Sequence, residues 1–240
     1  MTITEHKTVA EIVTENIKTA HVFKKYGIDF CCGGGVSIKS ACADKNVNFD
    51  VLEKELSAVD QLAKNAYDYN NWDLIFLIDH IVNIHHVYVE ESIPLLMQYA
   101  NRVAKVHGSH YSEVVTIDAL FFEVAQELSA HMKKEEHILF PYIKELINAE
   151  KNNTTPPQSH FGTIKNPIQM MEHEHESAGD IFKRIAELSN NYTPPEGACN
   201  TFKALYSKLD EFEQDLHQHI HLENNILHPK AVKLEQKITP

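Results

Sequence analysis

The feature that most constrains this chain is a phrase of eleven residues that occurs twice. Residues 131–141 are HMKKEEHILFP, and residues 219–229 are HIHLENNILHP. The two align without gaps on the pattern His-x-x-x-Glu-x-x-Ile-Leu-x-Pro. Because residues four apart lie one turn apart on the same face of a helix, each phrase places a His beside a Glu. The repeat therefore predicts two equivalent helices that supply matching halves of one site.

Four long segments of helical periodicity follow Trp72, and no strand-like alternation of any length interrupts them. The stretches between them are rich in Gly, Asn and Pro, which favour loops. Four amphipathic helices with short connections predict an all-α fold, an antiparallel four-helix bundle. The segments are residues 72–106, 112–150, 164–190 and 197–234.

Apolar residues at intervals of three or four indicate the buried face of each helix. On the second helix this stripe is Phe121, Val124, Leu128, His131, Glu135, Ile138 and Tyr142. The stripe of the fourth helix contains a His and a Glu at matching positions, and the stripes of the first and third helices contain one His each. The polar residues predicted to face the core are His86, His131, Glu135, His175, His219 and Glu223.

These six side chains predict a metal centre in the core of the bundle. Burying an ionised carboxylate among aliphatic side chains is costly unless it is paired or coordinated. Four imidazoles and two carboxylates exceed what one tetrahedral zinc accepts, whereas mixed nitrogen and oxygen ligation suits two irons, or iron with manganese. Two ferrous ions, or two ferric ions bridged by oxide, carry the same net charge. We therefore expect two non-haem iron ions, bridged by oxide and by carboxylates.

Other acidic and imidazole side chains compete for these roles. Glu136 and Glu172 are the nearest rival carboxylates, but Asn224 stands where Glu136 would repeat, which favours Glu135. His85 falls on a less apolar stripe than His86. Six further histidines lie off the stripes, so we expect surface or outer-sphere roles for them: His80, His137, His173, His217, His221 and His228.

The first 60 residues predict a small helical domain, joined by a linker over residues 61–71 to a bundle over residues 72–236. Thr8 and Ser37 have the pattern of helix N-caps, and Gly27 can end a helix. The turn from Gly27 to Ser37 begins with Gly27-Ile-Asp-Phe-Cys31-Cys32, which three glycines follow directly.

Adjacent cysteines close only a strained ring, so a Cys31–Cys32 disulfide would be readily reduced. A passive packing role is one interpretation of the pair. We favour a thiol relay that binds or passes iron, or that supplies electrons, because soft thiolates bind metals. Cys42 and Cys199 have no partner pattern, and we expect both to be buried as small apolar residues.

The net charge of −12 argues against nucleic acid as a partner, since phosphate binding needs clustered Lys and Arg. No apolar run is long enough to span a membrane, and the polar N-terminus contains no signal peptide. We therefore expect a cytoplasmic protein.

The segment from Trp72 to Lys233 resembles the hemerythrin-like di-iron proteins. With the leading Gly-Ile-Asp-Phe-Cys-Cys-Gly-Gly module, the whole chain resembles the Repair of Iron Centers family. The resemblance implies a bacterial cytoplasmic di-iron protein that restores iron–sulfur clusters damaged by nitric oxide or peroxide. It gives the ligand roles to the same six residues and makes Glu135 and Glu223 the carboxylate bridges.

The sequence departs from the oxygen-carrying hemerythrins at two places. Those proteins have a His-x-x-x-His pair on the third helix, where this chain has Met171 before His175. They also end with His-x-x-x-x-Asp, where this chain has His219-x-x-x-Glu223. One histidine fewer leaves an iron more open, which speaks against simple reversible oxygen carriage.

Three functions fit these residues. The leading hypothesis is a stress-response protein that donates iron to damaged iron–sulfur proteins rather than a turnover enzyme. The second is an oxidoreductase that reduces nitric oxide, or releases it from nitrosylated centres, at the di-iron site. The third is a sensor or store of O2, NO or iron. The sequence leaves a homodimer open.

Overall fold

The computed structural model describes residues 2–62, 68–156 and 158–238. Within these ranges the backbone forms helices and no strand, and the one bridge of β type joins Thr8 and Ser37. The fold is all-α, as predicted. The chain divides into two compact units, Met1–Ile78 with His217–Lys233, and Asp79–Leu216 with Leu234–Pro240.

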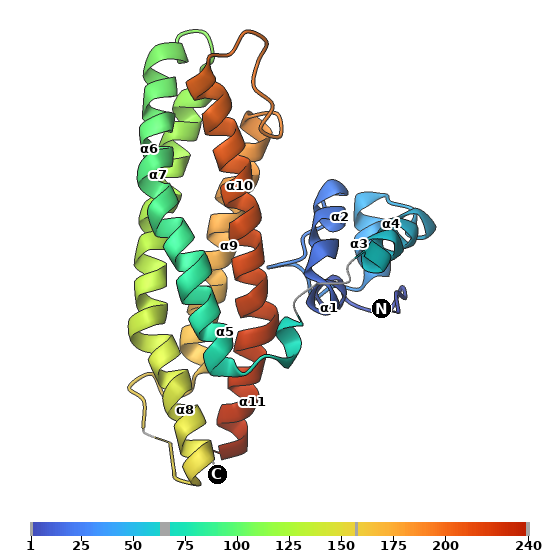
Figure 1. Cartoon of the computed structure of the whole chain (residues 1–240), viewed down its shortest axis with the longest axis vertical. Helices are drawn as coiled ribbons and strands as arrows, with labels where there is room; N and C mark the ends of the chain where they lie inside the picture. The colour runs from blue at the N-terminus through green and yellow to red at the C-terminus, as the bar shows by residue number, and fades with distance from the viewer. Residues whose placement is uncertain (1, 63–67, 157, 239–240) are drawn as a thin grey trace. The chain divides into compact units, whose positions relative to one another are not determined.

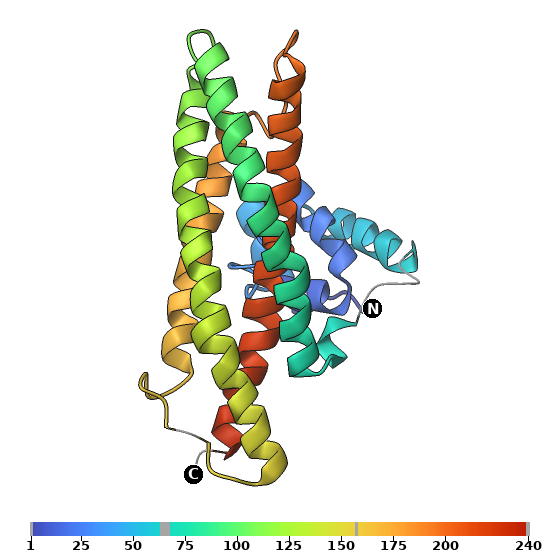
Figure 2. The same cartoon turned by 60° about the vertical axis from the view of Figure 1, so that its left-hand side comes forward.

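Four long helical runs follow the small N-terminal helices, close to the predicted ranges. In the second unit the long helices of these runs lie side by side and alternate in direction, as Figures 1 and 2 show. The first run is α5 (Leu74–His80), η3 (Ile81–His86) and α6 (Val87–His107), and the second is α7 (Glu113–Lys134), η4 (Glu135–Leu139) and α8 (Phe140–Asn152). The third is α9 (Lys165–Leu188), and the fourth is α10 (Asn200–Leu222), η5 (Glu223–Leu227) and α11 (His228–Ile238).

Aromatic rings from three of these helices fill the middle of the second unit. The Phe212 ring stacks on Phe182 at 5.5 Å between centroids and meets the edge of Phe121 at 5.8 Å. All three side chains are buried. The apolar stripes therefore point into a common core, because burying each such ring removes a large apolar area from water.

One residue of the predicted second stripe points the other way. Ile138 is 40% exposed, and its neighbour Leu139 is buried instead. The reason is η4, a π-helical segment, whose turn holds more residues than an α-helical turn. The extra residue moves the register by one position, so the prediction for Ile138 was wrong.

The first unit contains short helices whose ends match the predicted caps. Thr8 makes a complete capping box with Glu11, Ser37 caps α3 through the Ser40 N–H, and Gly27 follows α2 with φ +65°. Residues 63–67 of the predicted linker lie outside the described residues. The helices are α1 (Val9–Glu15), η1 (Ile17–Thr19), α2 (Ala20–Lys25), α3 (Ile38–Lys45), α4 (Phe49–Leu62) and η2 (Tyr69–Asn71).

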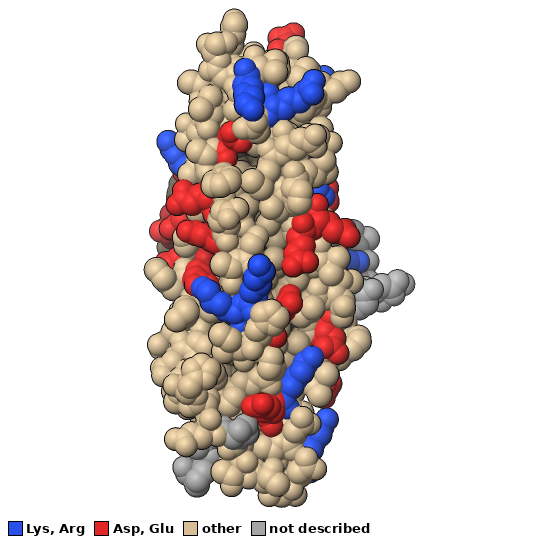
Figure 3. Space-filling view, turned by 90° about the vertical axis from the view of Figure 1, so that its left-hand side faces the viewer, with Lys and Arg blue, Asp and Glu red and all other residues tan. Residues whose placement is uncertain are grey.

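Charges on the visible surface are mixed. Figure 3 shows acidic side chains grouped across the middle of one face, with Lys and Arg dispersed among them. None of the helices described in the three residue ranges is both long and apolar enough to cross a membrane.

Candidate metal centre

Three of the six predicted ligands lie at π-helical segments. His86 is the last residue of η3, Glu135 is the first residue of η4, and Glu223 is the first residue of η5. A π-helical turn inside an α-helix is rare and is frequent at functional sites. The repeated phrase places η4 and η5 at equivalent positions, so the sequence repeat is also a repeat of this backbone distortion.

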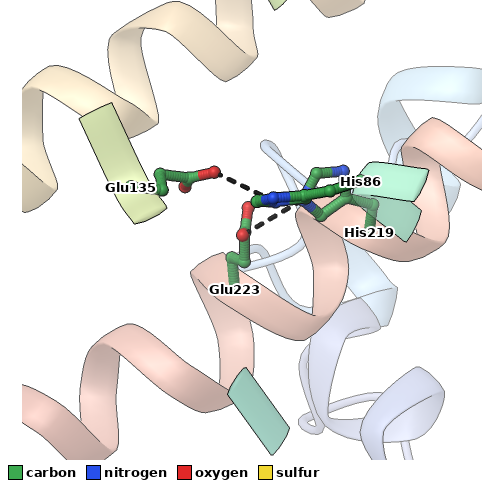
Figure 4. Close-up of side chains that lie close together, drawn as sticks. All are labelled: His86, Glu135, His219 and Glu223. Carbon is green, nitrogen blue, oxygen red and sulfur yellow. Dashed lines mark hydrogen bonds and ion pairs between the residues drawn. The ribbon is translucent and has the colours of Figure 1, made fainter. Parts of the chain in front are cut away.

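The structure brings the six predicted side chains together in two groups of donor atoms. In the first group, His86, Glu135, His219 and Glu223 offer donors that all lie within 4.8 Å of one another (Figure 4). His86 Nε2 is 3.3 Å from Glu135 Oε2, and His219 Nε2 is 3.1 Å from Glu223 Oε1. All four side chains are buried.

The second group contains His131, Glu135, His175 and Glu223 within the same limit. His131 Nε2 is 3.3 Å from Glu135 Oε1 and 2.9 Å from His175 Nε2. Glu135 therefore presents one carboxylate oxygen to His86 and the other to His131. Both carboxylates belong to both groups, which is the arrangement that two metal ions with bridging carboxylates require.

The hydrogen bonds of two imidazoles fix which of their nitrogens faces the centre. His86 Nδ1 lies 2.7 Å from Glu136 Oε1, and His131 Nδ1 lies 2.8 Å from Glu174 Oε2. An ionised carboxylate only accepts, so we assign the proton to each Nδ1. The Nε2 lone pairs then point at the buried carboxylates. This donor set fits a cation, because lone pairs and carboxylates brought this close would otherwise repel.

Glu174 is held ionised by its neighbours. Its hydrogen bond from His131, with a second from Lys134, lowers the pKa of Glu174 to about 2. A carboxylate behind a metal-binding histidine orients the ring and makes the imidazole a stronger donor. Glu136 and Glu174 were not predicted in this role: Glu136 was considered only as a rival ligand.

Comparison with known proteins matches both parts of the chain. The model of the Hemerythrin HHE cation binding domain matches residues 77–231, and a Domain of Unknown function (DUF542) matches residues 5–60. A "Probable iron-sulfur cluster repair protein" of Haemophilus influenzae is 38% identical over 88% of this chain and 90% of its own length. The "Iron-sulfur cluster repair protein YtfE" of Yersinia pseudotuberculosis is 36% identical over 89% and 91%. That of Yersinia pestis is 36% identical over 91% and 93%.

The chain belongs to the Repair of Iron Centers family. The family resemblance seen in the sequence is thus confirmed, and so is the hemerythrin-like class of the bundle. A cation-binding domain with buried His and Glu donors is suited to iron.

Histidines outside the two groups differ in their surroundings. His137 and His173 are exposed, as predicted. His221 and His228 are not on the surface: both are buried. His221 Nε2 lies 3.3 Å from Thr14 Oγ1, and burial lowers the pKa of His221 to about 4. His85, on the less apolar stripe, is also buried, with Nδ1 2.9 Å from Asp215 Oδ1.

The cysteines of this family member are all free thiols. Cys31 is buried and Cys32 is partly exposed, and neither belongs to a group of three or more metal donors among the described residues. Cys42 is buried, as expected. Cys199 is exposed, with its Sγ 3.3 Å from His107 Nε2, so the expectation of a buried Cys199 was wrong.

Proposed function

We propose that this chain is a cytoplasmic di-iron protein that repairs iron–sulfur clusters damaged by oxidative or nitrosative stress, by donating iron to them. One observation carries the proposal: two groups of buried donors share both carboxylates, Glu135 and Glu223. The relatives named as iron–sulfur cluster repair proteins support the physiological role.

The residues present would hold two iron ions, bridged by both carboxylates and by oxide in the oxidised state. His86 and His219 would bind one ion, and His131 and His175 the other. Bound iron supplies an exchangeable metal and one-electron redox chemistry.

The carboxylates around the centre can balance the charge of two bound iron ions. Glu135 and Glu223 carry two negative charges, and Glu136 and Glu174 place two more one hydrogen bond behind His86 and His131. Four carboxylates balance the four positive charges of two ferrous ions. Nitrogen and oxygen donors bind ferrous iron less tightly than the later divalent metals. A centre of this kind can therefore give up its iron.

The thiol pair is the proposed route out of the centre. Cys31 and Cys32 would pass iron, or supply electrons, to the damaged client. Thiolates are soft ligands shared with iron–sulfur clusters, which is the chemical reason for this assignment.

A second candidate is an oxidoreductase that reduces nitric oxide. Each donor group supplies four protein donors, whereas an octahedral ion takes six ligands. The remaining positions could take NO or O2 as a ligand. Catalytic turnover of NO with a supplied reductant would favour this candidate.

Transfer of labelled iron tests the proposed function. The protein is loaded with isotope-labelled ferrous iron and mixed with a cluster-dependent dehydratase that peroxide has inactivated. We expect dehydratase activity to return and the label to enter its cluster. His131→Ala should lower both, while His137→Ala, an exposed histidine six residues along the chain, should act as wild type. Equal reactivation by the iron-free protein would refute iron donation.

A further inference from the structure

The two thiols between α2 and α3 lie close together but in different surroundings. Cys31 Sγ and Cys32 Sγ are 3.9 Å apart and form no disulfide. Cys31 is 5% exposed, whereas Cys32 is partly exposed and is followed by the exposed Gly33. A small reagent from solvent therefore meets Cys32 before Cys31.

A carboxylate lies against the buried thiol. Asp29 Oδ1 accepts a hydrogen bond from the Cys31 thiol at 3.2 Å and another from the Cys31 backbone N–H at 2.8 Å. Asp29 Oδ2 accepts from the Gly33 N–H at 2.9 Å. Asp29 itself is exposed. It can thus take a proton from Cys31 and exchange it with water.

The backbone around the pair is held on both sides. Asn225 Nδ2 donates to the Cys31 carbonyl at 3.1 Å. A Cβ on Gly34 would lie 2.4 Å from the Phe30 carbonyl oxygen, so only glycine permits this close approach. The relative placement of Asp29 and the two thiols is therefore a built feature of the turn.

The Cys31 thiol also loses its proton less readily than an ordinary cysteine. The hydrogen bond to Cys32, burial and the charge of Asp29 raise the pKa of the Cys31 thiol well above its ordinary value. Because the thiolate is the reactive form, Cys31 needs a base beside it in order to attack.

We propose that the Cys31–Cys32 turn is a peroxide-oxidised dithiol, in which Cys32 is oxidised first, Cys31 resolves the product and Asp29 accepts the Cys31 proton. The oxidant is a small hydroperoxide, because closing a strained ring between adjacent residues needs the large driving force of O–O cleavage. The reaction uses no iron, so it goes beyond the proposed function and does not depend on it.

The atoms balance in two steps. The Cys32 thiolate attacks one peroxide oxygen, the O–O bond breaks, and Cys32 becomes a sulfenic acid. The other oxygen takes up the proton that the Cys32 thiol had released and leaves as an alcohol or water. Cys31 then passes its proton to Asp29 Oδ1 and attacks Cys32 Sγ, the S–O bond breaks, and water leaves with that proton. The two thiols lose two electrons and the peroxide gains them. A dithiol reductant restores the pair, which ring strain makes easy.

Mass spectrometry of the full chain tests the assignment. All proteins carry Cys199→Ser, which removes the other exposed thiol. After one equivalent of hydrogen peroxide, we expect a Cys31–Cys32 disulfide that dithiothreitol reverses. Cys31→Ser should instead hold a sulfenic acid on Cys32, captured by dimedone. Capture on Cys31 in Cys32→Ser, at a rate equal to that of Cys32, would overturn the order of attack.

The role of Asp29 needs its own comparison. Asp29→Asn should slow ring closure by about tenfold or more, with accumulation of the Cys32 sulfenic acid, because a lost base slows a proton-transfer step. Asp44→Asn, an exposed aspartate of α3, should close as fast as wild type. Closure at the wild-type rate in Asp29→Asn would remove Asp29 from the proposal. In the protein without substitutions at Asp29, Cys31 or Cys32, iodoacetamide should label Cys32 before Cys31. The reverse order would overturn the proposal.

Discussion

Replacing Glu136 by Gln should weaken iron binding although Glu136 is not a ligand. Its carboxylate receives the Nδ1 proton of His86 at 2.7 Å, and the His86 side chain is 2% exposed. Removing an outer partner of a metal-binding histidine typically costs 10- to 100-fold in affinity, about 1.4 to 2.7 kcal/mol. The Glu136 side chain is 32% exposed, which weakens the electrostatic part of its effect. We therefore expect the lower end of that range, about tenfold.

Competition with a ferrous chelator measures this change for each ion. In Glu136→Gln, affinity should fall only for the ion that we propose His86 and His219 bind. The reduction potential of the pair should rise, because a negative charge near the centre has been removed. Glu123→Gln, an exposed glutamate on α7, is the matched control. Unchanged affinity and potential in Glu136→Gln would refute the argument that this hydrogen bond positions His86.

Three further predictions test the site, the fold and the thiols. Glu135→Leu should lose iron but remain a helical bundle. Thermal unfolding should show this variant to be at least as stable as the iron-free wild-type protein, because removing a buried charge removes the cost of its desolvation. An unfolded variant would contradict this. In the iron-free protein, His221 has a pKa of about 4, so it takes up its proton at a lower pH than it does in the unfolded chain. Its contribution to the free energy of unfolding should therefore be complete above pH 6.5 and fall by about 3 kcal/mol as the pH drops to 4. Denaturant titrations of His221→Gln should lack this decline, whereas His137→Ala should retain it. Replacing Cys31 and Cys32 together by Ala should leave iron content unchanged but lower cluster reactivation, and iron loss would place the thiols at the metal centre.

The helices and the set of inward-facing polar residues were predictable because they follow one periodicity. Apolar stripes selected His86 over His85, and the mismatch at Asn224 selected Glu135 over Glu136. In the structure, the donor atoms of His86 and Glu135 belong to the two groups of metal donors, whereas those of His85 and Glu136 do not. The family resemblance rested on the same residues, together with the Cys-Cys-Gly-Gly turn.

The π-helical segments were not predictable from periodicity. A stripe assumes a constant number of residues per turn, and η4 breaks this at Glu135, a predicted ligand. The exposed side chain of Ile138 is the direct consequence. Ile138 and Leu139 are both apolar, so the sequence allows either of them to continue the stripe.

The burial of His221 depends on contacts far away in sequence. Thr14 and Phe30, from the first 60 residues, lie against it. Those residues form one compact unit with residues 217–233. A helical stripe reports the face that meets the bundle core and says nothing of what the other faces of the helix contact. The role of Glu174 was hidden for a similar reason, since its partner His131 is 43 residues away.

The metal content of the purified protein tests the central claim most directly. Elemental analysis of aerobically purified protein should give two irons per chain, one for each donor group. The protein should also show an oxide-to-iron charge-transfer band in the near ultraviolet. A single tightly held zinc ion without iron, in a folded protein, would contradict the di-iron account.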